Sequence, residues 1–524
     1  MIRTRFAPSP TGYIHVGSLR TALYAFLYAR HTGGKCILRI EDTDQKREVE
    51  GATDHLIKIL HEVGIDFDEG PSQGGDFGPY IQSQRTEIYR KYCQELLDKN
   101  EAYRCFCTAE RLEEMRTRQK ELKQAPMYDK TCLKLSPEIV QEKMNSGESF
   151  VIRQNVQHGE KLRFKDLVRG TVVFETSNID DQVLMKSDNF PTYHLANVVD
   201  DHLMQITHVI RGEDWLPSTP KHILLYQSFG WEIPEFAHLP LLVNKEKKKL
   251  SKRQNDVSVE SYLEKGYLIP ALNNFIAFLG WHPGKGDEQE IYTMEDLIEK
   301  FDLPQVHKSS ATFDTEKLDW FNYHWGKEIH NQEMAKIAKE IDADVTIEMN
   351  HRKEQVYTFS SPEKEVEFQT KRGESLLEKC KDQIEDGWMD DKDRLLRALV
   401  TLEDKILKNA NETAANLACF FTFKQAEKEL IMNEKMKVDE AIAKQALEGS
   451  YKALSNFEEW ETIGALQQFM LNLVQEMGLK NGQVLWPLRA ALSGEQYSPG
   501  AFEMLWALGK EESLTRIQTI IQTF

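Results

Sequence analysis

Residues 2–18 read IRTRFAPSPTGYIHVGS, and the residue types in this stretch predict a strand, a tight turn and a helix. The strand is expected over 2–7 and must end at Pro8, because proline cannot donate to a sheet ladder. Gly12 permits a sharp turn, and apolar residues recur at helical spacing from Gly17 onward. The free N–H groups at the start of such a helix favour anions, so this corner is predicted to bind a nucleotide phosphate.

The motif His-x-Gly at residues 15–17 is informative only because of the elements expected before and after it. The same spacing recurs at 31–33 and 324–326, where it is typical of a helix end and a turn. Only the first copy follows an expected strand and opens an expected helix, which suits a phosphate beside an imidazole and a close-approach glycine. The corner is not a G-x-G-x-x-G fingerprint, so the sequence does not indicate a dinucleotide cofactor.

A second motif lies in a basic segment further along the chain. Residues 247–253 read KKKLSKR and follow an expected strand at 239–243, and positions 245–253 hold six Lys or Arg and one Glu. Taken by itself, a lysine run of this kind is usually a solvated loop. In combination with the first motif it forms a much rarer pattern.

The two motifs resemble the two signature sequences of the class I aminoacyl-tRNA synthetases. Four stretches between them resemble the bacterial-type glutamyl-tRNA synthetases in particular. These stretches are RIEDTD at 39–44, EGP at 69–71, PTYHLANVVDDH at 191–202 and IRGEDW at 210–215. The resemblance covers essentially the whole chain, densely in the first 325 residues and more thinly afterwards, except at 482–494.

The resemblance implies a glutamate–tRNA ligase. Such an enzyme activates L-glutamate with ATP to give glutamyl-adenylate and pyrophosphate, and then transfers glutamate to the 3′-terminal adenosine of tRNA(Glu). The implied fold is multidomain: an α/β Rossmann-like catalytic domain with an α+β insert, followed by all-α anticodon-binding domains. The expected partners are tRNA(Glu), L-glutamate and ATP, and the expected state is a monomer, as is usual in the family. The sequence leaves open whether tRNA(Gln) is also charged.

Length and composition agree with a large globular enzyme. At 524 residues the chain is too long for one core, and its contents of 40% hydrophobic and 29% charged residues are ordinary for globular proteins. We expect no membrane span, and the absence of a leader pattern and of paired cysteines among the seven present predicts a cytoplasmic protein. The net charge of −18 argues by itself against nucleic-acid binding, although a local basic face remains compatible with it.

The expected domains follow the motifs along the chain. The catalytic domain is expected in two halves, 1–104 and 193–260, with the Lys-Leu-Ser-Lys loop in the second half. Between them, 105–192 is expected to form the acceptor-binding insert, or connective peptide. Residues 261–330 are expected to form a helical domain that contacts the tRNA stem, and 331–524 the helical anticodon-binding domains.

Alternation of strands and helices in the catalytic halves favours a parallel sheet with crossover helices, whose ligands bind at the carboxyl ends of the strands. Strands are expected at 36–40, 64–67, 150–154, 171–175, 182–185, 206–210 and 239–243. Helices are expected at 17–32, 52–63, 86–99, 193–203, 217–230, 267–280, 392–408, 434–455 and 460–477. Residues 344–374 are polar and irregular, and no element is predicted there.

The resemblance implies an ATP site formed by the two motifs. In that site His15 contacts the α-phosphate and stabilises the charge that develops there, while Gly17 leaves room for adenosine. Lys252 stabilises the β- and γ-phosphates as pyrophosphate leaves, and Mg²⁺ bridges phosphate oxygens. The resemblance further implies that three residues order the basic loop: Lys249, Ser251 and Arg253. It also implies that Asp214 and Leu242 contact ATP. No covalent enzyme intermediate is required.

A glutamate pocket needs two cationic anchors and one anionic anchor, because glutamate carries two carboxylates and one ammonium. The sequence offers Arg5, Arg211 and Glu41, each near an expected strand end. Singly, either arginine is as well explained by a surface ion pair. The resemblance implies three groups: Arg5 with Tyr193 for the side-chain carboxylate, Arg211 with Asn197 for the α-carboxylate, and Glu41 with Ala7 and Ser9 for the ammonium.

Three cysteines in the insert have a spacing that suits tetrahedral zinc. They form the pattern C-x-C-x24-C and are Cys105, Cys107 and Cys132. Some members of the family bind a structural zinc with this spacing and a fourth ligand just after the third cysteine. That place holds Lys134, which cannot serve, whereas Tyr128 or Asp129 could. Two interpretations stay open: a zinc site, or reduced cysteines in an insert that has lost its metal.

Four other functions stay open on the sequence. A small-molecule nucleotidyltransferase of the same superfamily, and a shorter paralogue that glutamylates a modified tRNA base, both lack a helical region like 331–524. A glutaminyl enzyme is expected to end in β-barrels, and Arg5 suits an anionic side chain better than an amide. A non-catalytic nucleic-acid-binding protein has little reason to keep both phosphate motifs.

Overall fold

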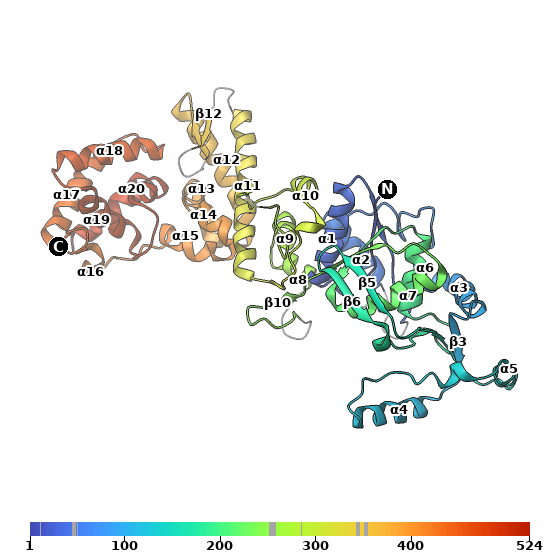
Figure 1. The fold of residues 1–524 in the computed structure, drawn as a ribbon. Helices are drawn as coiled ribbons and strands as arrows, with labels where there is room; N and C mark the ends of the chain where they lie inside the picture. The colour runs from blue at the N-terminus through green and yellow to red at the C-terminus, as the bar shows by residue number, and fades with distance from the viewer. Residues whose placement is uncertain are drawn as a thin grey trace. The chain divides into compact units, whose positions relative to one another are not determined.

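The computed structural model describes residues 1–524 except 11, 45–48, 50, 251–257, 285, 342–345 and 350–354, and at 346–349 it describes only the backbone. Three residues of the expected Lys-Leu-Ser-Lys loop therefore lie outside the described residues: Ser251, Lys252 and Arg253. The chain divides into two compact units, Met1–Asn322 and Tyr323–Phe524 (Figure 1).

The first unit is built around the strand–turn–helix of the opening stretch. Strand β1 (Arg3–Phe6) lies parallel to β2 (Lys35–Leu38), and α1 (Val16–His31) connects them. This confirms the parallel pairing expected from the sequence. Helix α1 is buried over most of its surface, because the sheet covers one side and α9 (Ile269–Ala277) and α10 (Met294–Lys300) pack on another.

The sheet continues beside this pair. The amide of Thr207 donates to the Arg3 carbonyl at 3.0 Å, just before β8 begins. A four-stranded sheet then follows in the order β6, β5, β9, β8, in which β8 (His208–Gly212) and β9 (Glu235–Leu239) are parallel, while β5 (Lys161–Asp166) and β6 (Gly170–Glu175) form an antiparallel hairpin. Other helices of this unit are α2 (Ala52–Glu62), α3 (Thr86–Asp98), α6 (Tyr193–Leu203) and α7 (Thr219–Phe229).

The strand expected at 64–67 does not form, and that prediction is wrong. Gly64 has φ +80°, which ends α2 in a left-handed turn, and Ile65 and Phe67 are buried without joining a ladder. Pairing is limited to a parallel bridge between Glu69 and Ile37. Conversely, the expected elements do not include β5, whose side chains alternate between exposed and buried sides with period two.

Two other expected strands are displaced. The strand expected at 206–210 begins only at His208, so Arg211 lies inside β8 rather than after it. The strand expected at 239–243 is divided into the end of β9 and the short β10 (Leu242–Val243). Pro240 separates the two because it has no N–H to donate to a ladder.

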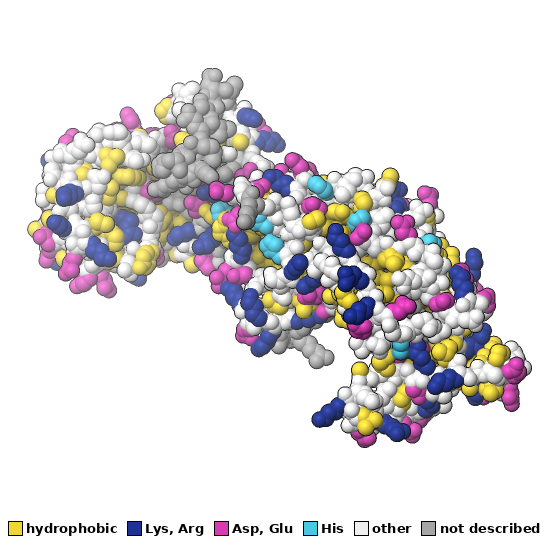
Figure 2. All heavy atoms as spheres, viewed as in Figure 1, with side chains coloured by type: hydrophobic (Ala, Val, Ile, Leu, Met, Phe, Trp, Pro, Cys, Tyr) yellow, Lys and Arg dark blue, Asp and Glu magenta, His cyan; other side chains and the backbone are white. Residues whose placement is uncertain are grey.

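The residues expected to form the insert belong to two different sheets. Strands β3 (Ala102–Cys105), β4 (Val151–Gln154) and β7 (Val183–Met185) form an antiparallel sheet, and α4 (Ala109–Glu121) and α5 (Pro137–Asn145) extend from β3 (Figure 1). Neither α4 nor α5 has a buried residue. The β5–β6 hairpin is instead part of the sheet that contains β8 and β9. Acidic and basic side chains are mixed over the face drawn in Figure 2, including this extension.

The last part of the first unit is mainly helical. Helix α8 (Val259–Glu264) precedes α9 and α10, and β11 (Ala311–Thr312) pairs in parallel with β10. The helix expected at 267–280 is α9, which is shorter because it ends ahead of Gly280, a residue with φ +101°. Helix α11 (Thr315–Ile341) begins in the first unit and continues into the second.

The described part of the second unit is mainly helical. Part of 344–374 forms a hairpin of β12 (Thr346–Met349) and β13 (Gln355–Thr358). The helices are α12 (Pro362–Cys380), α13 (Lys392–Thr401), α14 (Glu403–Lys408), α15 (Thr413–Phe421), α16 (Lys428–Ile431), α17 (Glu440–Ser455), α18 (Ile463–Glu476), α19 (Asn481–Ser493) and α20 (Ala501–Ile521), and helices α13 to α20 share one apolar core. The helix expected at 392–408 is two helices, and the one expected at 434–455 begins only at Glu440. Among the described helices of both units, none is long and apolar enough to cross a membrane.

Helices α12 and α13 approach closely at Gly373. A Cβ atom added there would lie 2.8 Å from Leu396 Cβ and 2.9 Å from the Leu396 carbonyl oxygen. We therefore expect Gly373→Ala to lower the free energy of unfolding by about 1–3 kcal/mol, because the backbone contact cannot relax. Gly464→Ala in α18 is the matched control, since nothing lies within 4 Å of its Cβ position and alanine favours a helix. Urea unfolding followed by circular dichroism distinguishes the two variants, and equal stability would contradict the close approach.

Candidate active site

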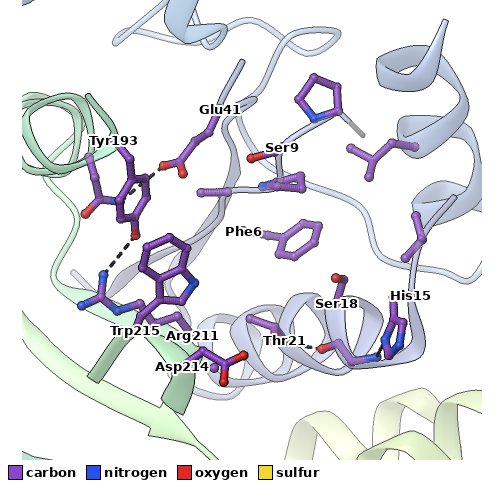
Figure 3. A pocket seen from close by; sticks show the side chains of 18 of the residues that line it. Phe6, Ser9, His15, Ser18, Thr21, Glu41, Tyr193, Arg211, Asp214 and Trp215 are labelled. Carbon is purple, nitrogen blue, oxygen red and sulfur yellow. Dashed lines mark hydrogen bonds between the residues drawn. The ribbon is translucent and has the colours of Figure 1, made fainter. Parts of the chain in front are cut away.

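A cavity of about 870 Å³ opens at the carboxyl ends of β1, β2 and β8 (Figure 3). Its walls come from segments far apart in the sequence, as expected when parallel strands end at one edge of a sheet. All of the described residues that the sequence analysis links to glutamate or ATP line this cavity: Arg5, Ala7, Ser9, His15, Gly17, Glu41, Tyr193, Asn197, Arg211, Asp214, Leu242 and Lys249. The structure thus brings together what the motifs only suggested.

The phosphate-binding corner predicted from the opening stretch is formed by His15 and the start of α1. The Gly17 amide donates to His15 Nδ1 at 2.9 Å, so the imidazole caps the helix. A neutral His15 that accepts at Nδ1 carries its proton on Nε2, which makes Nε2–H a hydrogen-bond donor. A Cβ at Gly17 would lie 3.2 Å from Nδ1, so a larger residue would crowd this cap.

One wall of the cavity contains a buried network of guanidiniums and carboxylates. Arg5 Nε donates to Asp201 Oδ1 at 3.1 Å. Arg39 donates to the same oxygen at 2.7 Å and to Glu41 Oε1 at 3.0 Å. Burial by itself would raise the pKa of Asp201, but the guanidiniums of Arg5 and Arg39 outweigh it and lower that pKa. For Glu41 burial prevails, and its pKa is raised in spite of Arg39.

Arg211, the other arginine that the sequence links to glutamate, also lines the cavity and is buried, with 5% of its surface exposed. It donates to the Tyr193 hydroxyl at 3.1 Å and to Thr219 Oγ1 at 3.0 Å. Figure 3 shows Arg211 and Tyr193 meeting at the side of the cavity where Glu41 points inward. Asn197, which the resemblance groups with Arg211, donates instead to Glu41 Oε1 at 3.3 Å.

The basic loop begins next to the cavity. Residues 242–250 turn back on themselves, with the Leu250 amide donating to the Leu242 carbonyl at 3.1 Å. Lys249 Nζ forms an ion pair with Asp214 Oδ2 at 2.6 Å, and both side chains are about half exposed. The loop and the stretch after β8, which the resemblance links separately to ATP, are therefore connected by a direct contact.

Sequence reasoning attached no role to three residues that shape this cavity. Arg39 and Asp201 complete the ion network, and the position of Arg39 inside the otherwise apolar stretch 36–40 was the signal that it is buried and paired. Trp215 packs against Tyr193 with ring centroids 4.3 Å apart and remains 40% exposed at the cavity wall. A single tryptophan after two acidic residues carries no pattern that reveals such a contact.

The cysteines of the C-x-C-x24-C pattern form a cluster in which all sulfur atoms lie within 4.8 Å of one another: Cys105, Cys107 and Cys132. Tyr128, one of the two expected fourth ligands, lies beside the cluster, with its hydroxyl 3.3 Å from Cys107 Sγ. Asp129, the other expected fourth ligand, pairs with Arg111 Nη2 at 2.6 Å. A hydrogen bond from Cys132 lowers the pKa of Cys105 to about 4. The donor set suits zinc, whose tetrahedral thiolates lie about 3.8 Å apart.

Comparisons with known proteins agree with this architecture. The family model described as "tRNA synthetases class I (E and Q), catalytic domain" matches residues 1–320, and an "Anticodon binding domain" model matches 375–521. A glutamate–tRNA ligase of Chloroherpeton thalassium is 43% identical, with 99% of this chain and 97% of that protein covered; one of Clostridium tetani is 41% identical with the same coverage. The crystal structure of a glutamate tRNA ligase from Elizabethkingia meningosepticum, in complex with its amino acid, superposes with a TM-score of 0.76 at 32% identity, with 100% of this chain and 99% of that chain covered.

The ion network extends to Asp200, which is fully buried and accepts from Arg85 Nε at 2.7 Å and from the Tyr89 hydroxyl at 2.8 Å. We expect Asp200→Asn to lower the free energy of unfolding by about 3–5 kcal/mol, because it leaves Arg85 buried without its charge partner. Glu87→Gln is the control, since Glu87 is 82% exposed and its pair with Arg90 is screened by water. Urea titrations measure both, and a similar small effect for the two variants would contradict the network's importance.

Proposed function

The chain belongs to the class I tRNA synthetases of the glutamate and glutamine group, and from this premise we propose how its cavity performs the reaction. It is a glutamate–tRNA ligase, an ATP-dependent enzyme whose substrates are glutamate, ATP and tRNA. One observation supports the residue assignments above all others. One cavity joins a helix N-terminus with the buried guanidiniums of Arg5 and Arg211 and the buried carboxylate of Glu41.

Glutamate matches these charges group by group. We propose that Arg5, with the Tyr193 hydroxyl, binds the side-chain carboxylate, and that Arg211 binds the α-carboxylate. Glu41 then receives the ammonium together with the polar groups of Ala7 and Ser9. Asn197 donates to Glu41 and can still reach the α-carboxylate, because the ammonium and the α-carboxylate of an amino acid share one carbon atom. Planar guanidiniums suit both carboxylates because each can form two parallel hydrogen bonds.

ATP is proposed to lie along the start of α1. The Nε2–H group of His15 donates a hydrogen bond to the α-phosphate. Negative charge grows there as the glutamate carboxylate attacks phosphorus and pyrophosphate leaves. Gly17 leaves space for adenosine, and Mg²⁺ enters with ATP as the counterion of its phosphates. The ion pair of Lys249 with Asp214 supports a role in holding the base of the basic loop. Lys252, which lies outside the described residues, is proposed to act on the β- and γ-phosphates.

The second unit is proposed to bind the anticodon of tRNA(Glu), in line with the family model matched there. With a net charge of −18 we expect few phosphate contacts, so recognition should depend on unstacked bases held against aromatic or arginine side chains. A monomer in the cytoplasm is proposed as well. Seven free cysteines support a reducing compartment.

We also propose that the cysteine cluster holds a structural zinc. The ligands are Cys105, Cys107 and Cys132, with Tyr128 as the fourth. Its hydroxyl lies beside Cys107 and accepts from the Cys132 amide at 3.0 Å, which places its oxygen among the sulfurs. Bound zinc supplies no chemistry to the reaction in this proposal. It joins β3 to the segment that contains Cys132 and so stiffens the insert.

ATP–pyrophosphate exchange tests the function directly. The full-length protein should catalyse exchange with glutamate and at most weakly with glutamine or aspartate, with tRNA present or absent in parallel reactions. Arg5→Ala should erase most of the preference for glutamate over glutamine, because the side-chain carboxylate loses a buried charge partner worth about 2–5 kcal/mol. A wild-type enzyme that uses glutamine as well as glutamate would refute the proposal. A variant that still discriminates would show that Arg5 binds elsewhere on the substrate.

Metal analysis tests the cysteine cluster. Protein purified without chelators should contain about one zinc per chain by mass spectrometry. Cys132→Ser should lose that zinc, whereas Cys93→Ser should keep it, because Cys93 is a buried thiol outside the cluster. Removal of the metal should lower the melting temperature of the wild type but not that of Cys132→Ser. Metal-free protein that fails to take up added zinc would favour the other interpretation, a set of reduced cysteines.

A further inference from the structure

Arg211 is buried and its hydrogen-bond partners are all uncharged, as are the backbone carbonyls that accept from Arg20, another buried arginine of the cavity. Its Nε donates to His238 Nε2 at 3.1 Å, and its Nη1 lies 3.3 Å from His222 Nδ1. The Tyr193 and Thr219 hydroxyls complete the set. Among the described residues no carboxylate forms an ion pair with Arg211. By contrast, four other buried arginines each have one: Arg3, Arg5, Arg39 and Arg85.

Asp166 determines which ring nitrogen of His238 can accept a hydrogen bond from Arg211. Asp166 Oδ2 lies 2.6 Å from His238 Nδ1, and both side chains are fully buried. A carboxylate can only accept, so Nδ1 carries the proton and Nε2 of the neutral ring presents a lone pair to Arg211. Asp166 is itself held in place, because its Oδ1 accepts from the amides of Val168 and Arg169 at 3.0 and 2.7 Å in the turn between β5 and β6.

A second histidine pair supports the same arrangement. His222 Nδ1 faces Arg211, so its proton lies on Nε2 and is donated to His194 Nδ1 at 3.0 Å. Burial lowers the pKa of His194 to about 4 and that of His222 well below its usual value. Burial also lowers the pKa of His238, although Asp166 opposes the change. All three rings are therefore neutral near pH 7.

We propose that Asp166 and His238 are positioning residues of the glutamate site, which fix Arg211 through a neutral acceptor and so keep its charge available for a substrate carboxylate. An ion pair would hold the guanidinium equally well but would neutralise it before the substrate arrives. A hydrogen bond to a neutral imidazole holds it in place and leaves the positive charge without a counterion. This inference rests on the proposed role of Arg211 in glutamate binding.

The proposal predicts a change in glutamate binding rather than in catalysis. Arg211 binds the α-carboxylate before the reaction, and the negative charge of that carboxylate falls as it attacks phosphorus. A misplaced Arg211 therefore weakens the ground state at least as much as the transition state, which raises KM for glutamate with little loss of kcat. Asp166→Asn keeps the shape of the side chain, but its amide can donate to Nδ1 and turn His238 into the wrong tautomer, with an N–H directed at Arg211. We expect KM for glutamate to rise about ten- to a hundredfold, with KM for ATP unchanged.

Two further variants separate positioning from folding. Gln places an amide oxygen near the position of Nε2, so His238→Gln should keep KM for glutamate within about threefold, whereas His238→Leu should raise it like Asp166→Asn. Asp181→Asn is the matched structural control, because Asp181 is equally buried and accepts from Tyr103 at 2.6 Å in the insert sheet. It should leave KM for glutamate unchanged even if it lowers the melting temperature.

Pyrophosphate exchange at varied glutamate and ATP concentrations measures these constants, and calorimetric titration with glutamate measures binding without turnover. A wild type that shows no glutamate-dependent exchange contradicts the proposed function itself. A wild type that is active, together with an Asp166→Asn variant whose KM for glutamate stays within twofold, overturns only the positioning role. If Asp166→Asn does not fold, the comparison of His238→Gln with His238→Leu decides, and equal KM values for those two overturn the proposal.

Discussion

A buried cation needs a partner, and this constraint holds the catalytic unit together. Arg39 is fully buried and bridges Glu41, just after β2, to Asp201 on α6. Arg5 on β1 shares Asp201 with it. Removing these groups from water is costly unless the geometry of the pairs is good, so the network permits few alternative arrangements of the segments that carry it. The ends of two strands and one helix are therefore held at the same edge of the sheet.

Arg211 satisfies the same constraint differently. Its hydrogen bonds go to hydroxyls and to imidazoles kept neutral by burial. Of the two guanidiniums that we assign to glutamate, Arg5 has its charge balanced by Asp201, whereas Arg211 has no ion-pair partner among the described residues. In our proposal the unbalanced charge is met by a carboxylate of glutamate, and the cost of burying it is offset when the substrate binds. Both arginines bind glutamate in our proposal, but only Arg5 also forms an ion pair that helps to hold the folded network together.

The phosphate corner combines a structural and a chemical task in one side chain. His15 accepts from the Gly17 amide at Nδ1 and so caps α1, a helix that is buried over most of its length. The same bond leaves the proton on Nε2, the donor that we propose for ATP. Substitution of His15 therefore affects both the start of α1 and the site, and a stability measurement is needed beside any loss of activity.

The sequence by itself determined the strand–turn–helix at 2–32, the parallel pairing of β1 with β2, and most of the residues that line the cavity, because each depends on local periodicity, turn chemistry or a motif. It could not determine that Arg5 pairs with Asp201, or that Arg211 contacts His238 and, through it, Asp166. Those contacts join residues far apart in the chain, and their side-chain types are compatible with many partners. The same holds for β5, whose place beside β9 in the sheet no local pattern records. Charge balance within the cavity is a property of tertiary structure, because it depends on which buried groups come within hydrogen-bonding distance of one another.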